Sequence, residues 1–316
     1  MQHFDSAGLP WIAMASVLIA QFVGAAPAPS TDPPAGIPEI TVVAPRPAEP
    51  HEIAGDNVAT FIRAHGKPGK RTGQLGRWAD AVCLVTEGLT PAFNDFVTTR
   101  VRAIATAVHV PQQTTQRCDT NVLIVFTTEP QVFLDDVVKR RPQWLGFHYA
   151  AEVPRLKTVD RPIQAWYATA THSRTFELHF PNAVAQHQAD MALDDAWSPT
   201  PAAALGSRLS PGMESFIVFA LVVVDTKKIT DYTIGAISDY IAMMALSQMR
   251  LTDGCGELPS ILDLMTPTCR SATADSITAG DIAYLKALYS IDLGHDVSMQ
   301  RSSIEDMMMR DLKRQE

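Results

Sequence analysis

A single carboxylate inside an apolar segment is the side chain in this sequence most suited to chemistry. Asp239 lies within 230–249, where apolar residues recur on every side of a helix, and such a helix is buried. An unpaired buried carboxylate is costly. Asp239 is therefore either a group of perturbed pKa at the floor of a cleft, or a polar anchor bonded to backbone or to an arginine such as Arg208. Asp239 and its neighbour Tyr240 are the candidate binding residues, and no catalytic residue is assigned.

Two other groups of side chains could bind metals, but their spacing argues against it. His172, His179, His187 and Asp190 match no known ligand pattern and are interpreted as surface or hydrogen-bonding groups. The methionines near the C-terminus would suit Cu(I), yet consecutive methionines on a helix point in different directions, which favours core packing. The sequence also has no nucleophile elbow and no glycine-rich phosphate loop. We therefore expect no metal and no cofactor.

The chain has four cysteines and no C-x-x-C pair, which disfavours structural zinc and favours disulfides. The simplest pairing joins neighbours, Cys83 with Cys118 and Cys255 with Cys269. The alternative is four buried free thiols in a cytosolic protein.

The charge balance and the N-terminus predict an exported protein. The 316 residues carry 26 basic and 34 acidic side chains, a net charge of −8, with no run of Lys or Arg, which disfavours nucleic acid and anionic lipid as partners. An uncharged stretch from Ala7 to Thr31, followed by small residues, predicts a signal peptide over 1–26. Because no Lys or Arg precedes the stretch, an uncleaved inner-membrane anchor is the alternative. After cleavage we expect no stable membrane span and a periplasmic or otherwise exported location.

Residues 27–74 are expected to form a proline-rich extended tether and a polar lead-in. Within them the segment from Glu39 to Ala44 is short, β-prone and flanked by turn residues. It resembles the TonB box, by which outer-membrane receptors pair with TonB. The segment is thus either a linker or first strand, or a strand that pairs with a TonB-like partner.

The rest of the chain, 75–316, is expected to form one α+β domain with a mixed sheet, a buried central helix and C-terminal helices. The run 215–225 is continuously apolar, which predicts a central strand covered on both faces. Periodicity predicts further strands over 78–86, 121–127 and 163–171, and helices over 91–108, 131–140, 230–249, 277–289 and 302–313.

This order of elements resembles the zincin metalloprotease scaffold. The stretch from Asp281 to Tyr289 is similar to the D-I-x-x-[IL]-x-x-L-Y signature of the C-terminal helix in matrixin-type proteases, and Pro259 to Asp263 resembles the loop before it. Further features are Arg77-Trp78, Cys83, the strand from Arg117-Cys118 to Thr128 and the helix with Asp239-Tyr240. Together with these, the chain resembles a group of exported bacterial proteins of unknown function from about 75 to 312. Zincins carry H-E-x-x-H on the central helix, whereas this chain has the residues Asp239 to Met243 there. The resemblance therefore implies a degenerate, metal-free version without zincin proteolysis.

The expected function is a non-catalytic envelope module that binds a peptide or protein partner in the degenerate cleft. The alternative is a hydrolase whose active site, around Asp239, is not recognisable from sequence. Such an enzyme would show an ordered polar cleft and strongly shifted carboxylates near Asp239.

Overall fold

The computed structural model describes residues 55–69, 72–113, 118–146, 151–173, 213–269 and 274–314. All of them belong to one compact unit, Ala44–Glu316. The expected signal peptide and the TonB-box-like segment lie outside the described residues. Among the described helices, none has the length and apolar character needed to cross a bilayer.

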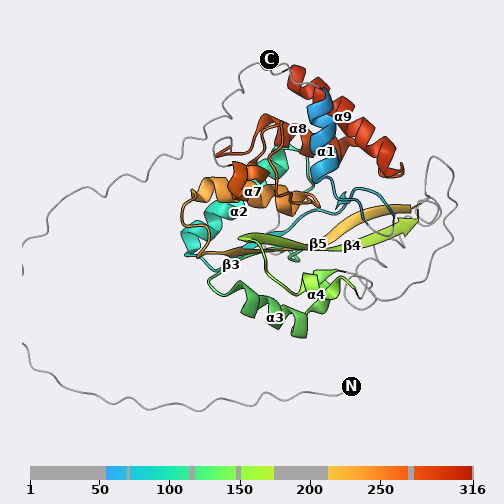
Figure 1. Ribbon diagram of the computed structural model, residues 1–316. Helices are drawn as coiled ribbons and strands as arrows, with labels where there is room; N and C mark the ends of the chain where they lie inside the picture. The colour runs from blue at the N-terminus through green and yellow to red at the C-terminus, as the bar shows by residue number, and fades with distance from the viewer. Residues whose placement is uncertain are drawn as a thin grey trace, which may run out of the picture. The chain divides into compact units, whose positions relative to one another are not determined.

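A five-stranded mixed sheet organises the domain around its last strand (Figure 1). One edge of that strand, β5, pairs antiparallel with β4 along its whole length, and the other edge pairs in parallel with β1 and then with β3. The short β2 adds in parallel beyond β3. The strands are β1 (Arg77–Trp78), β2 (Leu84–Glu87), β3 (Val122–Thr127), β4 (Ile163–Ser173) and β5 (Met213–Asp225). The apolar run expected to be central is therefore central, and Ala220, Leu221 and Val222 are fully buried.

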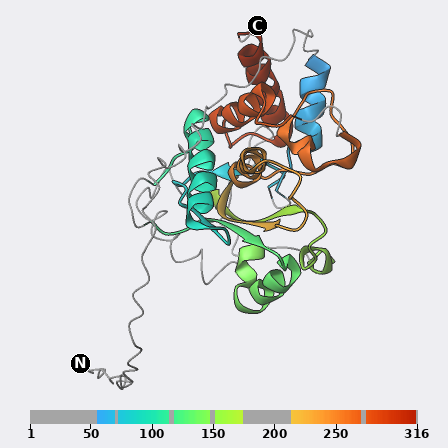
Figure 2. The same ribbon diagram turned by 90° about the vertical axis from the view of Figure 1, so that its left-hand side faces the viewer.

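Helices cover both faces of the sheet, as Figure 2 shows. One face carries the larger layer and core: α2 (Pro91–Ala107), α7 (Ile234–Leu246), α1 (Gly55–His65), α8 (Ala279–Ser290) and α9 (Val297–Lys313). The other face carries a thin layer and a smaller apolar cluster: α3 (Pro130–Arg140), the 3-10 helix η1 (Pro142–Leu145) and the short α4 (Val153–Leu156). The single α+β domain with C-terminal helices is confirmed.

Two expectations from sequence need correction. The polar lead-in expected within 27–74 contains the helix α1, and Val58, Phe61 and Ile62 on this helix are buried at helical spacing. Because α1 packs against α9, the folded domain begins before residue 75. The single strand expected over 78–86 is two strands, because the chain changes partners there: β1 pairs with β5 and β2 with β3.

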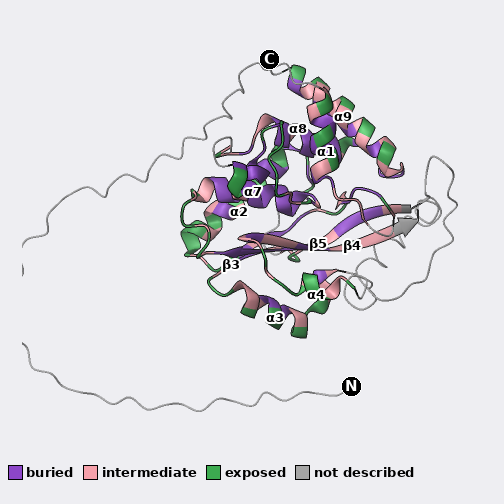
Figure 3. Cartoon of the chain, viewed as in Figure 1, coloured by how far each residue is buried: buried purple, intermediate pink, exposed green. Residues whose placement is uncertain are grey.

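The central helix α7 is enclosed by protein, as expected, although it is shorter than 230–249. Every residue from Ala236 to Leu246 is buried, and the visible part of α7 is mostly purple in Figure 3. The last four carbonyls of a helix have no partner within it and need other donors when buried. Here four side chains supply them: Ser247 Oγ to Met243 O (2.7 Å), Tyr167 OH to Met244 O (2.7 Å), Trp78 Nε1 to Ala245 O (2.9 Å) and Tyr289 OH to Leu246 O (2.6 Å).

These capping donors should be needed for stability. Tyr167→Phe keeps the ring but leaves the Met244 carbonyl buried without its donor, so the free energy of unfolding should fall by about 1–3 kcal/mol in urea titrations. Tyr232→Phe, on a half-buried tyrosine just before α7, is the control and should have little effect. Equal stabilities for the two variants would show that the carbonyl finds another donor.

Candidate functional site

Asp239 lies fully buried on α7 and is held by an arginine of α2 and a backbone amide before α8. Arg100 donates from Nε to Oδ1 (2.6 Å) and from Nη2 to Oδ2 (2.9 Å). The Ile277 amide donates to Oδ2 (2.9 Å). Both carboxylate oxygens are therefore engaged, as in a buried polar anchor. The arginine is Arg100 rather than Arg208, which lies outside the described residues.

The geometry of this pair makes it a strong interaction. Two parallel hydrogen bonds from a guanidinium to a carboxylate combine charge with fixed orientation. The Asp239 side chain is 1% exposed and that of Arg100 is 25% exposed, so solvent screens only one end of the pair. Hydrogen bonding to Asp239 raises the pKa of Arg100. The pair thus ties together α2, α7 and the segment that leads into α8.

Tyr240, the second candidate from the sequence, is a core residue. It is 2% exposed, and burial raises the pKa of its phenol above the ordinary value. The charges of Arg161 and Asp263 also act on its pKa, in opposite directions. A ligand at the surface reaches neither Asp239 nor Tyr240.

Two further buried carboxylates lie near α8, which the sequence analysis named only as ends of the zincin-like segments and not as candidate site residues. Asp281, in the first turn of α8, accepts hydrogen bonds from Ser260 Oγ (2.6 Å), Ile261 N (2.9 Å) and Thr278 N (3.0 Å). Burial raises its pKa. Thr278 accepts from the Asp281 amide in return, which makes a capping box. The T-x-x-D spacing was the available signal for this residue.

Asp263 lies in the 3-10 helix η2 (Ile261–Met265) and is 4% exposed. Burial, together with the nearby charge of Asp281, raises the pKa of Asp263 to about 6. A carboxyl group with such a pKa changes protonation just below neutral pH. Asp263 is positioned by the loop between α7 and α8. The apolar residues Ile261, Leu262 and Leu264 of this loop are buried in the core and fix its path.

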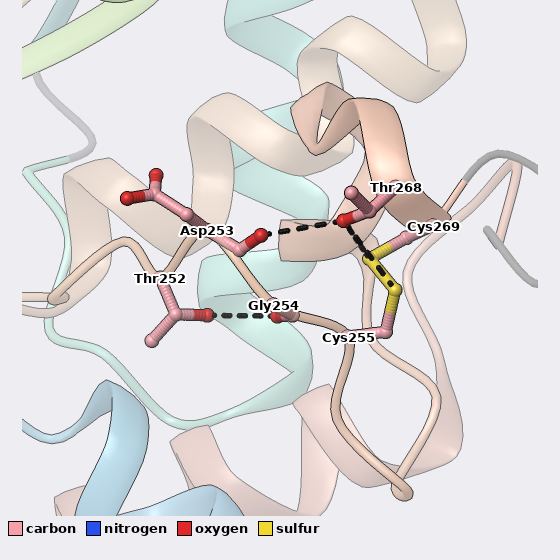
Figure 4. The surroundings of a disulfide bond; sticks show 6 residues. All are labelled: Thr252, Asp253, Gly254, Cys255, Thr268 and Cys269. Atoms are coloured by element: carbon pink, nitrogen blue, oxygen red, sulfur yellow. Dashed lines mark hydrogen bonds between the residues drawn. A yellow bond between two sulfur atoms is a disulfide. The ribbon is translucent and has the colours of Figure 1, made fainter.

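A disulfide closes that loop. The expected neighbour pairing is confirmed for both bridges, Cys83–Cys118 and Cys255–Cys269. In the second bridge, Cys255 is exposed and Cys269 is buried. The Thr268 hydroxyl lies 3.9 Å from Cys255 Sγ and 3.8 Å from Cys269 Sγ, and it donates a hydrogen bond to Asp253 O (Figure 4). Loop closure over a separation of 14 residues stabilises the fold by about 3 kcal/mol in the chain-entropy model.

The residues considered as metal ligands give no site in the described part of the chain, where no three His, Cys, Asp or Glu side chains are grouped to hold an ion. His179, His187 and Asp190 lie outside the described residues, and His172 lies in β4. Of the C-terminal methionines, Met308 is fully buried and Met307 and Met309 pack against the core, as expected.

Comparisons with protein-family models, with curated proteins and with solved structures find no match to this chain. The zincin-like resemblance therefore stays a prediction from sequence.

The Asp239–Arg100 pair should dominate the stability of this region. Arg100→Gln leaves a buried carboxylate unpaired and should lower the free energy of unfolding by about 2–4 kcal/mol. Asp239→Asn should cost less, and the double variant should lose less than the sum of the two, with a coupling of about 1 kcal/mol or more in urea titrations. Asp136→Asn, which breaks an exposed pair with Arg140, should change stability little. Strict additivity would contradict a direct pair.

Asp263 should make stability depend on pH. Its folded-state pKa of about 6 exceeds the ordinary 3.8, so the native state holds this proton more tightly. Its contribution is therefore complete below about pH 4 and is lost as the pH rises through 6. Asp263→Asn should raise the melting temperature at pH 7.5 and have little effect at pH 4.

The control is Asp253→Asn, on a 93% exposed side chain of the same loop, which should show no such pH-dependent gain. If Asp263→Asn instead lowers the melting temperature at pH 7.5 and has little effect at pH 4, the charged carboxylate is a required acceptor and the sign of this prediction is wrong.

Proposed function

We propose that this chain is an exported, non-catalytic binding module on a metal-free, zincin-like scaffold. The observation that supports this most directly is the engagement of Asp239. A general acid or base must come within hydrogen-bond reach of its substrate. Asp239 is fully buried with both oxygens bonded to Arg100 and Ile277, so its role is to hold three elements together.

The segment that corresponds to the zincin motif supports the same proposal. The residues from Asp239 to Met243 are each at most 2% exposed. The positions at which a zincin would present two histidines and a glutamate to solvent are here occupied by side chains that pack in the core. The proposed module is therefore a pseudoenzyme, and binding takes place elsewhere on its surface.

Export to the periplasm is part of the proposal. Two disulfides are typical of proteins that fold in an oxidising compartment, and the charge-free stretch near the N-terminus is typical of a signal peptide. Both features favour an exported protein over a cytosolic one.

One observation favours the alternative, a hydrolase. Asp263 has its pKa raised to about 6, near the value that suits a general acid or base at neutral pH. Its charge also acts on Tyr240, the second candidate residue from the sequence. Against this reading, the Asp263 side chain is almost completely buried.

Turnover measurements separate the two functions. The oxidised protein and its Asp239→Asn, Tyr240→Phe and Asp263→Asn variants are assayed on mixed fluorogenic peptides and on acetyl and phosphate esters. The proposal expects no turnover above the blank for any of the four proteins. Turnover that the parent protein shows and that Asp263→Asn or Asp239→Asn loses, while circular dichroism confirms the fold, would establish the hydrolase instead.

A further inference from the structure

The two disulfides differ in how they meet solvent. Cys83, directly before β2, is 1% exposed, and its backbone is hydrogen-bonded to Asn121 through both its N–H (2.7 Å) and its C=O (3.2 Å). Its partner Cys118 is half-buried. Cys255 is exposed and lies in a run, 253–257, in which every residue is exposed. A thiol in solution can therefore approach Cys255 while the domain is folded, and exposed disulfides are the exchangeable ones.

The chain on either side of 253–257 is held without this bridge. Before the run, the Arg250 amide donates to His65 O (2.8 Å). After the run, the Ile261 side chain is fully buried and the Ile261 amide donates to Asp281 Oδ2 (2.9 Å). Breaking the bridge therefore releases a short surface segment and leaves the apolar contacts of the loop in place.

Contacts at Asp253 add little to the hold of the bridge on this run. Arg161 Nη2 lies 2.9 Å from Asp253 Oδ1, but the Asp253 side chain is 93% exposed, so solvent screens the pair. The Thr268 hydroxyl donates to Asp253 O over 3.3 Å. The covalent bridge is therefore the strongest constraint on this part of the loop.

The Thr268 hydroxyl lies beside both sulfurs of the bridge (Figure 4). Attack on Cys255 expels Cys269 as a thiolate, and Cys269 is 1% exposed. A buried thiolate is a costly leaving group unless it is hydrogen-bonded. Because the hydroxyl is 3.8 Å from Cys269 Sγ, a small rotation away from Asp253 O lets it donate to that thiolate.

We propose that Cys255–Cys269 is a redox switch, which a dithiol reductant opens while the domain stays folded. A thiolate of the reductant attacks Cys255 Sγ, the S–S bond breaks, and its electron pair leaves with Cys269 Sγ, which accepts a hydrogen bond from Thr268 and then a proton. The second thiol of the reductant attacks the mixed disulfide and expels Cys255. Two electrons and two protons thus pass to the two cysteines, and the reductant becomes a disulfide.

The switch goes beyond the proposed binding function and connects the surface to the interior. Opening the bridge frees 253–257, which includes Gly256. The Gly256 amide hydrogen-bonds to the Asp263 carboxylate in the oxidised protein. The reduced protein therefore has a changed surface at this loop and a buried carboxylate with one donor fewer.

The rates of reduction test whether the folded protein exposes one bridge and protects the other. The full oxidised chain is treated with dithiothreitol, samples are quenched with acid at intervals, and mass spectrometry of peptides counts the intact bridges. We expect Cys255–Cys269 to open about tenfold or more faster than Cys83–Cys118. In concentrated guanidinium chloride the two rates should become alike, because folding then protects neither bridge.

The Thr268→Val variant tests the hydroxyl. It should slow the reduction of Cys255–Cys269 several-fold with little change in melting temperature, since Thr268 is exposed. Thr268→Ser keeps the hydroxyl and should restore the rate of the parent protein.

Hydrogen exchange tests whether opening is local. In Cys255→Ala, which lacks the bridge permanently, the amides of 253–257 should exchange faster than in the oxidised parent, while Ile261 and the middle of α7 stay protected.

The proposal is overturned if both bridges open at the same rate in the folded protein, if Cys255–Cys269 opens only where denaturant unfolds the domain, or if Ile261 and α7 lose protection together with 253–257. An unchanged rate in Thr268→Val overturns the role of its hydroxyl. These outcomes leave the non-catalytic function standing, because the turnover assay tests that function on the oxidised protein.

Discussion

A helix surrounded by protein has to find partners for all its polar groups inside the fold, and the arrangement of this domain depends on how α7 does so. Its one carboxylate, Asp239, is bonded to Arg100 and to the Ile277 amide. Its last four carbonyls accept donors from β1, β4, α8 and its own C-cap residue. Because an unsatisfied buried group is so costly, these contacts fix the elements that supply them relative to α7.

The same requirement fixes the aromatic side chains around the end of α7. Trp78 and Tyr289 turn their polar atoms toward α7 and donate to its last two carbonyls. The carboxylates near α8 work in a similar way, since Asp281 fixes the start of that helix through Ser260 and Ile261. Polar side chains at the centre of this domain therefore position secondary structure.

Much of the fold could be predicted because its main elements carry continuous local patterns. The apolar run of β5, the all-round apolar α7 and the periodic α2 were located to within a few residues, and neighbour spacing predicted both disulfides. The α1 helix was missed because it follows a proline-rich stretch, although Val58, Phe61 and Ile62 have helical spacing. The split of 78–86 into two strands depends on pairing partners that local sequence does not specify.

The site was harder to predict, because its contacts are distant in sequence. Burial of Asp239 implied a partner, but 139 residues separate it from Arg100, and no local pattern distinguishes that arginine from the others. Asp263 owes its shifted pKa to the loop fold around it and to Asp281.

Native-state hydrogen exchange at single amides tests most directly whether the buried carboxylates hold the domain together. The Ile277 and Ile261 amides donate to Asp239 and Asp281, respectively. If these bonds are structural anchors, both amides exchange only through global unfolding, with the same opening free energy as the amides in the middle of α7. Exchange of Ile277 and Ile261 through a small local opening, while α7 stays protected, would mean that the carboxylates are regularly released to solvent and would contradict this account.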